Sequence, residues 1–331
     1  MRQILNRLFE HQALSRTEAH EVMKKMAEGK YNESQIAAFI SVYLMRSIEL
    51  DEILGFREAL LSMALPLDFS DFDILDIVGT GGDEKNTFNI STAACFAVAG
   101  AGYQVVKHGN YAATSVSGSS NVLEYFGARF TTDERVLKQS LEAGGFAYLH
   151  APIFNPAMKN VAPVRKSLGV RTFFNVLGPL ISPARPQVQC LGVYNLKMLR
   201  LYSYIYQQLG MKYSIVHSLD GYDEISLTDA SMVVTNQGER ILSPTQLGYS
   251  VLQQHDLYGG ATIQEAAGIF MNVLDGKATE AQRNAVTVNA AIAIQTQCPD
   301  KSLDMCRSEA EESLQSGAAK QSFTTFLQYY K

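Results

Sequence analysis

The feature that most constrains the fold is one strand, turn, helix and strand unit between residues 73 and 107. The short apolar run DILDIV leads into the glycine-rich turn GTGGD, a helical stretch of small residues, STAACFAVAGAG, and a second apolar run, YQVVK. Parallel strands need a crossover connection, usually a helix, so this pattern predicts a βαβ unit. Four more apolar runs, FAYL, VQCLGV, YSIVHS and SMVVTN, follow with helical patterns between most of them. We therefore expect an α/β fold class with a mainly parallel central sheet wrapped by helices.

The N-terminal part of the chain has a different periodicity. Between about residues 2 and 63, apolar residues recur at intervals of three and four, which predicts an all-helical segment. Ser15 with Glu18 and Asn32 with Gln35 have the spacing of capping boxes, so each pair marks a helix start.

A chain of 331 residues is longer than one ordinary core, so either two domains or one large α/β unit with an attached piece is expected. The segment PVRKSLGVRTFFNVL looks helical and interrupts the strand pattern, and we expect it to join the N-terminal helices. The predicted domains are a small all-helical domain of residues 1–66, joined by about 163–185, and a large α/β domain of residues 70–162 and 186–331.

Composition argues against several classes of protein. With 28 Lys and Arg against 33 Asp and Glu, the net charge of -5 gives no general attraction for nucleic acid or an anionic membrane. The four cysteines lack a paired metal-ligand spacing and suit buried, reduced thiols. Charges interrupt the apolar residues after Met1, and no stretch reaches about 18 uncharged apolar residues. We expect a soluble cytoplasmic protein, with partners that are neither nucleic acid nor membrane.

The first polar motif is the turn from Gly79 to Asp83, which precedes a helix start rich in hydroxyls, Asn89 to Thr92. Glycines let the backbone approach a phosphate, and the free amides and dipole of a helix start favour an anion. A tight turn without a ligand is the alternative for a glycine-rich turn taken alone. The coincidence of strand, turn and helix start favours a phosphate site.

The second polar motif, Lys107 to Asn110, ends the next strand and leads into hydroxyl-bearing residues up to Ser120. A lysine at the carboxyl end of a parallel strand suits phosphate oxygens in the crevice above the sheet. The alternatives are a solvated surface charge for Lys107 and a histidine satisfied by neighbouring backbone for His108.

The third polar motif is the acidic turn after YSIVHS, in which Asp223 and Glu224 are adjacent. Neighbouring carboxylates repel one another, and a magnesium ion that joins them to phosphate oxygens relieves the repulsion. The alternative is an acidic surface turn. In the fourth motif, Arg165 could pair in a forked geometry with a substrate carboxylate, and the alternative is a solvated basic helix face.

Taken together and in this order, GTGGD, NIST, KHGN, VRxxLGxRTxFNxLGPL and DGxDE resemble the motifs of the anthranilate phosphoribosyltransferase family of tryptophan biosynthesis. The resemblance covers nearly the whole chain. It implies a helical domain hinged to an α/β domain, as in the nucleoside phosphorylase and phosphoribosyltransferase fold, and a homodimer through the helical domain. It also implies a magnesium-dependent transfer, with two Mg²⁺ ions, of the phosphoribosyl group of phosphoribosyl pyrophosphate to anthranilate.

The family's functional residues carry over to the matching positions of this sequence. Those implied for phosphoribosyl pyrophosphate are Gly79, Gly82, Asp83, Thr87, Asn89, Ile90, Ser91, Thr92, Lys107, His108, Gly109, Asn110, Tyr111, Ala112, Ala113, Thr114, Ser115 and Ser119. Those implied for anthranilate are Gly79, Asn110 and Arg165, and those implied for the metal are Ser91, Asp223 and Glu224. No residue is assigned as general base, because an aromatic amine of low pKa loses its proton only as the new bond forms.

The sequence departs from the usual family pattern at a few positions. Tyr111 stands where Arg usually follows KHGN, Thr114 precedes Ser115 in place of paired serines, Asn121 replaces a frequent Asp, and Ser182 replaces an Asn. Two other functions remain open at this point: a pyrimidine nucleoside phosphorylase-like enzyme on the same fold, and a non-catalytic paralogue that binds nucleic acid. The adjacent acidic pair argues against the first, and the negative net charge argues against the second.

Overall fold

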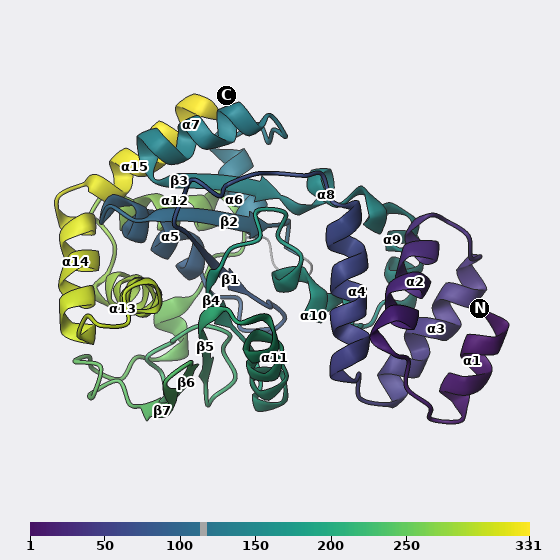
Figure 1. Cartoon of the computed structure of the whole chain (residues 1–331). Helices are drawn as coiled ribbons and strands as arrows, with labels where there is room; N and C mark the ends of the chain where they lie inside the picture. Colours follow the sequence, from purple (N-terminus) through teal and green to yellow (C-terminus); the bar gives the residue numbers. More distant parts are fainter. Residues whose placement is uncertain (113–117) are drawn as a thin grey trace. The chain divides into compact units, whose positions relative to one another are not determined.

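The computed structural model describes residues 1–112 and 118–331 and divides the chain into two compact units. One unit is helical and consists of residues 1–67 and 151–185, and the other is an α/β unit of residues 68–150 and 186–331 (Figure 1). The segment that returns to the helical unit therefore begins at residue 151, before the position 163 expected from the sequence.

The helical unit is built from four N-terminal helices and several short returning ones. These are α1 (Arg2–Phe9), α2 (Arg16–Ala27), α3 (Glu33–Met45), α4 (Leu50–Met63), α8 (Ala151–Phe154), η1 (Pro156–Asn160), α9 (Ala162–Leu168), α10 (Phe174–Leu177) and η2 (Gly178–Leu180). Both expected capping boxes are present, at Ser15 with Glu18 and at Asn32 with Gln35. Gly55 lets α4 approach α2 closely, because a Cβ there would lie 2.3 Å from the Arg16 carbonyl oxygen.

An aromatic cluster explains why the returning segment belongs to the helical unit. The Phe173 ring lies with its centroid 5.0 Å from the rings of both Tyr43 and Phe56 and 6.2 Å from that of Phe39. All four rings are buried, so the segment is held by burial of aromatic surface. The expectation that residues 163–177 are helical is wrong in the middle of the segment: Gly169 adopts a left-handed φ of 62° and ends α9, and α10 begins at Phe174.

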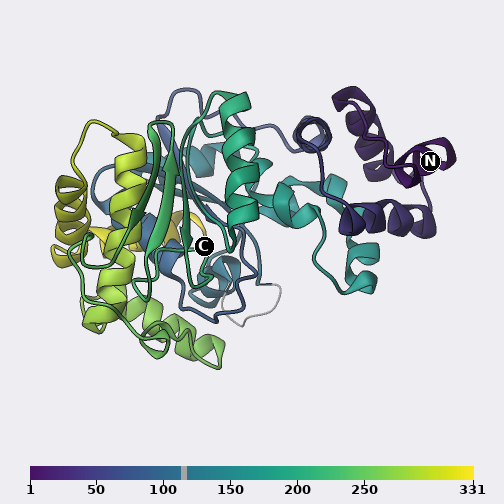
Figure 2. The ribbon, with the colours of Figure 1, turned by 90° about the horizontal axis from the view of Figure 1, so that it is seen from below.

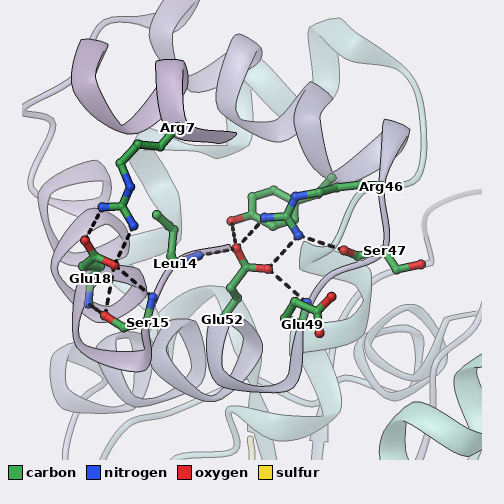
Figure 3. Close-up of polar contacts among 9 residues, drawn as sticks. Arg7, Leu14, Ser15, Glu18, Arg46, Ser47, Glu49 and Glu52 are labelled. Atoms are coloured by element: carbon green, nitrogen blue, oxygen red, sulfur yellow. Dashed lines mark hydrogen bonds and ion pairs between the residues drawn. The ribbon is translucent and has the colours of Figure 1, made fainter. Parts of the chain in front are cut away.

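A buried carboxylate also ties the helical unit together. Glu52 of α4 accepts hydrogen bonds from the Leu14 and Glu49 backbone amides, from the Tyr43 hydroxyl and from the Arg46 guanidinium (Figure 3). The same figure shows the exposed pair of Arg7 and Glu18 beside it.

In the described part of the α/β unit, seven strands form one sheet in the order β3-β2-β1-β4-β5-β6-β7. The strands from β3 to β5 are parallel, and β6 and β7 are antiparallel, which confirms the expected mainly parallel sheet. The strands are β1 (Ile74–Gly79), β2 (Gln104–Gly109), β3 (Phe146–His150), β4 (Val188–Gly192), β5 (Lys212–Ser218), β6 (Ser231–Thr235) and β7 (Gly238–Leu242). The sequence pattern missed β7, because its residues GERIL are mostly exposed and lack an apolar alternation.

The direction of chain progression reverses between β1 and β4. The chain moves from β1 to β2 and β3 on one side and from β4 to β5 on the other, so right-handed crossovers put the connecting helices on opposite faces. Figure 2 shows α11 on one side of the strands and α13 with α14 on the other. Ligands of such sheets bind outside the carboxyl ends of the strands at the point of reversal.

Helices cover both faces of this sheet. They are α5 (Ile90–Gly100), α6 (Ser119–Tyr125), α7 (Glu134–Gly144), α11 (Leu196–Leu209), η3 (Gln254–Leu257), α12 (Ile263–Leu274), α13 (Glu280–Gln297), α14 (Leu303–Gln315) and α15 (Ala318–Tyr329). The small residues of α5 allow close helix packing, since a Cβ on Gly100 would lie 2.3 Å from Ser313 Oγ. Among the helices of residues 1–112 and 118–331, none is both long and apolar enough to cross a membrane.

Candidate functional site

The ends of β1 and β4, where the sheet reverses direction, surround a small pocket. Its polar lining comes from Ser91, Asp223, Glu224 and Asn289. The rest of the lining is Ile77, Val78, Gly79, Cys190, Gly192 and Val216. The loop after β5 therefore reaches across to the loop after β1, and two of the expected motifs meet here.

Asp223 is fixed against the glycine turn. Its Oδ2 accepts a hydrogen bond of 2.7 Å from the Gly81 amide, and a Cβ on Gly79 would lie 2.6 Å from the same oxygen. A Cβ on Gly192 would lie 1.5 Å from the Asp223 backbone oxygen. Glycine is thus required at the ends of both β1 and β4 for the acidic loop to pack where it does. The sequence pattern did not single out Gly192, although a glycine at the end of an apolar strand was the available signal.

Glu224 points to the start of α5. Its Oε1 accepts a hydrogen bond of 2.9 Å from the Ser91 amide, one of the free amides of that helix start. Its other carboxylate oxygen, Oε2, is buried and has no hydrogen-bond partner among the described residues. A buried acceptor without a donor costs free energy, so we expect this oxygen to bind a ligand.

The two carboxyl groups are electrostatically strained. Burial and, next in size, the neighbouring Asp83 carboxylate raise the pKa of the Asp223 carboxyl to about 7, while the hydrogen bond from the Gly81 amide opposes the increase. Burial, Asp223 and Asp83 raise the pKa of Glu224 well above its ordinary value. Two adjacent carboxyl groups whose ionisation is disfavoured form a site that a cation would stabilise.

The residues fit magnesium in company with an anionic ligand. Within the described part of the chain, no group of three or more His, Cys, Asp or Glu side chains is arranged to hold a metal by itself. Magnesium is commonly held by one or two carboxylates together with phosphate oxygens and water, so a pair such as Asp223 and Glu224 is sufficient.

The glycine turn itself has an unusual backbone. Gly81 and Gly82 have φ of 63° and 80°, and Glu84 and Asn86 also adopt positive φ. The strand-like pairing of Thr87 with Tyr258 fixes the far end of the loop. The loop therefore runs as an irregular backbone between the strand end and α5, as a backbone that surrounds a phosphate must.

The expected contacts at the start of α5 differ in exposure. Asn89, Ile90 and Thr92 are buried, whereas Ser91 is partly exposed at the pocket. Ile90 and Thr92 are therefore expected to offer a ligand their backbone groups, and Ser91 can offer its hydroxyl.

Lys107 contacts Ile77, one of the residues that line the pocket. It is buried, and its Nζ donates a hydrogen bond of 2.6 Å to the Ile77 carbonyl of β1. The surface-charge alternative for Lys107 is therefore wrong. Asp76 lies nearby, buried within β1, and its Oδ2 accepts from Gln189 Nε2 at 2.8 Å. Burial raises the pKa of Asp76 to about 6, while Lys107 and Gln189 oppose the increase.

The second polar loop begins at the end of β2. His108 is buried, Gly109 packs against Tyr148 and Ser119, and the Asn110 carbonyl accepts from the Ser120 amide at 3.2 Å. The Ala112 amide donates to Asn121 Oδ1 at 3.0 Å, so Asn121 links the start of the loop to α6. Of the expected donor-binding residues, Ala113, Thr114 and Ser115 lie outside the described residues.

Tyr111 is held by neighbours from two other elements. Its ring meets the His150 ring edge-on at 4.9 Å, and its hydroxyl donates to Glu124 Oε1 at 3.2 Å. His150 in turn is stacked on Phe130 at 4.5 Å and shares a hydrogen bond of 2.9 Å with Ser120. The substitution at position 111 thus places an aromatic side chain, 41% exposed, at the start of the loop.

Arg165 lies on α9 in the helical unit, whereas Gly79 and Asn110 lie in the α/β unit. Its guanidinium stands 5.2 Å from the centre of the Phe174 ring and forms no ion pair with a described residue of its own unit. Burial lowers its pKa. An arginine that is partly buried without a counter-charge can bind an anionic ligand. Ser182 is buried in the same unit, with no described hydrogen-bond partner for its Oγ.

Comparisons with known proteins agree with this geometry. The chain matches the α/β domain of a glycosyl transferase family over residues 71–320 and the helical bundle domain of that family over residues 2–64. The anthranilate phosphoribosyltransferase of Bacteroides fragilis (strain YCH46) is 56% identical over 328 residues, which is 99% of each chain.

Solved structures extend the similarity to the fold. The anthranilate phosphoribosyltransferase of Thermus thermophilus superposes with a TM-score of 0.92 at 33% identity, covering 98% of each chain. That of Saccharomyces cerevisiae, in complex with phosphoribosyl pyrophosphate and magnesium, gives a TM-score of 0.90 at 27% identity, covering 98% of this chain and 96% of the yeast chain. The resemblance seen in the sequence motifs is confirmed, and the chain belongs to the anthranilate phosphoribosyltransferase family.

Proposed function

We propose that this protein transfers the phosphoribosyl group of 5-phosphoribosyl 1-pyrophosphate to the amine nitrogen of anthranilate. The products are N-(5-phosphoribosyl)anthranilate and pyrophosphate, and the reaction is the second step of tryptophan synthesis from chorismate. The observation that carries the proposal is the meeting of the Gly79 to Asp83 turn with buried Asp223 and Glu224 at the start of α5. The yeast relative that binds phosphoribosyl pyrophosphate and magnesium supports the same assignment.

The donor would bind along the irregular loop and the helix start. The amides of the turn and helix start that are not bonded to Asp223 or Glu224 would offer hydrogen bonds and a favourable dipole to its pyrophosphate, with Lys107 and the loop from Asn110 to Ser119 completing the site. Asp223, Glu224 and the Ser91 hydroxyl would hold two Mg²⁺ ions. When bound, magnesium neutralises the negative charge that grows on the departing pyrophosphate.

The chain's own residues then act mainly by binding and orientation. The bond between the ribose and pyrophosphate breaks with positive charge spread over the anomeric carbon and the ring oxygen, while the loop amides stabilise the leaving group. Arg165 would bind the carboxylate of anthranilate, and Asn110 with Gly79 would line its site. Holding the amine nitrogen near the anomeric carbon contributes more than proton transfer, so no general base is assigned.

Loss of anthranilate fluorescence tests the function directly. The purified protein should consume anthranilate only when both phosphoribosyl pyrophosphate and magnesium are present. Phosphorolysis of thymidine in place of this reaction would favour the nucleoside phosphorylase alternative. A shift of single-stranded DNA at low salt, without anthranilate consumption, would favour the nucleic-acid-binding alternative.

We also propose a homodimer formed through the helical unit, in the cytoplasm. Neighbouring helices α1 and α3 expose large apolar side chains, with Phe9 at 60% and Met45 at 88% of their full exposure. Exposed apolar side chains of this size favour burial against another chain. All four cysteines are free thiols, as a reducing compartment requires. Analytical ultracentrifugation should give twice the chain mass, and a monomer at micromolar concentration would contradict the dimer.

A further inference from the structure

Asn289 makes an unusual pair of hydrogen bonds from the middle of α13. Its Oδ1 accepts from the Ile225 amide at 3.0 Å, and its Nδ2 donates to the Ile225 carbonyl at 2.9 Å. Nδ2 also donates to the Ala285 carbonyl at 2.8 Å, one turn earlier in the same helix. One buried side-chain amide therefore satisfies both backbone groups of a residue 64 positions away.

Ile225 is the residue that follows the acidic pair, and it is fully buried. On the other side, Ser218 at the end of β5 donates from Oγ to the Glu224 carbonyl at 2.7 Å and accepts from the Ser226 amide at 3.1 Å. Ser218 thus holds the neighbours of Ile225 on both sides to β5, and Asn289 holds the amide and carbonyl of Ile225 to α13. The loop that carries Glu224 has few remaining degrees of freedom.

This restraint acts against a specific force. Asp223 and Glu224 are adjacent carboxylates that line the same pocket, and like charges held close together repel, so a loop free to move would let them separate. Asn289 also lines the same pocket as Ser91 and the two loop carboxylates. Helices hold functional groups more rigidly than loops do, so a side chain from α13 is well suited to oppose this repulsion.

We propose that Asn289 is a positioning residue for the magnesium site, which keeps Asp223 and Glu224 at the separation that binds the metal. It acts through the Ile225 peptide and does not itself contact the metal. The inference rests on the proposed function, because the metal and pyrophosphate are taken from it.

The test compares two asparagines whose side-chain amides each accept from one backbone amide and donate to a backbone carbonyl. Asn236 also joins two backbone groups, since its Oδ1 accepts from the Tyr213 amide at 2.9 Å and its Nδ2 donates to the Met211 carbonyl at 2.8 Å. It lies in the turn between β6 and β7 and bonds to the start of β5, at the opposite end of that strand from the acidic loop. Asn236→Ala, at an exposed position, is therefore a control for the loss of side-chain hydrogen bonds to backbone away from the pocket.

Equilibrium binding of Mn²⁺ with pyrophosphate, followed by the Mn²⁺ electron paramagnetic resonance signal, reports the site without turnover. Asn289→Ala should weaken Mn²⁺ binding by about ten-fold or more, as loss of outer-shell support does elsewhere. Asn236→Ala should stay within about two-fold of the unchanged protein. Hydrogen exchange at the Ile225 amide should accelerate in Asn289→Ala alone.

Unchanged Mn²⁺ affinity in Asn289→Ala, or an equal loss in both variants, would overturn the inference. If Asn289→Ala does not fold, Ser218→Ala decides, because it removes the hydrogen bond that joins β5 to the Glu224 carbonyl of the same loop. Unchanged Mn²⁺ affinity in Ser218→Ala would count equally against the inference. Anthranilate consumption by the unchanged protein is measured on the same preparation. If the unchanged protein consumes anthranilate and Asn289→Ala binds Mn²⁺ normally, only the role of Asn289 is refuted. If the unchanged protein is inactive and binds no Mn²⁺, the proposed function is refuted.

Discussion

Replacing Glu52 with Gln should destabilise the helical unit strongly. The carboxylate accepts from the amides of Leu14 and Glu49 at 3.0 Å, from the Tyr43 hydroxyl at 3.0 Å and from Arg46 at 2.8 Å, with its side chain fully buried. Glutamine keeps one acceptor oxygen, but its NH₂ group would face donors, and the mostly buried guanidinium of Arg46 would lose its counter-charge. Removing one partner of such a pair costs about 3 to 5 kcal/mol, a large share of the stability of a small unit.

The pH dependence of the same interaction has a definite sign. Burial alone would raise the pKa of Glu52, but the hydrogen bond from Arg46 and those from the Leu14 and Glu49 amides lower it below its ordinary value. A carboxyl whose pKa is lowered on folding stabilises the protein above its unfolded pKa, about 4.3, and this contribution is lost as pH falls through the folded value. The helical unit should therefore lose stability below about pH 4.3, and Glu52→Gln should lack this component.

Urea unfolding with hydrogen exchange on the amides of α2 and α4 measures the effect within the unit, since a chain of two units need not unfold in one step. Glu18→Gln provides the control, because Glu18 also pairs with an arginine, Arg7, but both side chains are about 40% exposed. Exposed pairs contribute little. The reasoning is refuted if Glu52→Gln is no more destabilising than Glu18→Gln.

Three further variants test the site, and a fourth serves as a control. Asp223→Asn combined with Glu224→Gln should reduce turnover through lost metal, and an unchanged dependence of rate on magnesium concentration would contradict the assignment. Arg165→Ala should raise KM for anthranilate by about ten-fold or more and KM for the donor less, as expected for a lost charge-assisted hydrogen bond, and the reverse order would move anthranilate elsewhere. Gly79→Ala should raise the half-saturating magnesium concentration by about ten-fold, because the new Cβ, 2.6 Å from Asp223 Oδ2, must displace that oxygen. Gly268→Ala meets no atom within 4 Å and should leave the magnesium dependence unchanged, so equal effects of the two alanines would show that the contact with Asp223 is irrelevant.

Features encoded over a few neighbouring residues were predictable from the sequence. The βαβ unit was visible because DILDIV, GTGGD and the small-residue helix follow one another, and they form β1, the irregular loop and α5. The capping boxes at Ser15 and Asn32 depend on residues three positions apart, and both are formed. The meeting of the first and third motifs was also predictable, because parallel strands end at the same edge of a sheet.

Features that depend on distant partners were missed. Asp76 lies inside an apolar strand and binds Gln189, 113 positions later, and Asn289 binds Ile225 across 64 positions. A polar residue in a strand or mid-helix gives no local signal of what it will contact in the folded chain. Gly169 was missed for a different reason, since apolar periodicity on both sides of one glycine conceals the left-handed residue that ends α9.

Two glutamates of this chain show how surroundings separate a structural carboxylate from one that needs a ligand. Glu52 is buried among several donors, one of them cationic, and the net effect lowers its pKa, so its charge is stable in the protein alone. Glu224 accepts one bond from Ser91, and its Oε2 lacks a described partner. Burial, followed by Asp223 and Asp83, raises its pKa. A protein that only needed a stable loop at this position would gain from an amide or an apolar side chain in place of Glu224. An acidic pair beside a helix start is accounted for when a cation and a phosphate bind there together, since the cation neutralises the carboxylates and the helix dipole favours the phosphate.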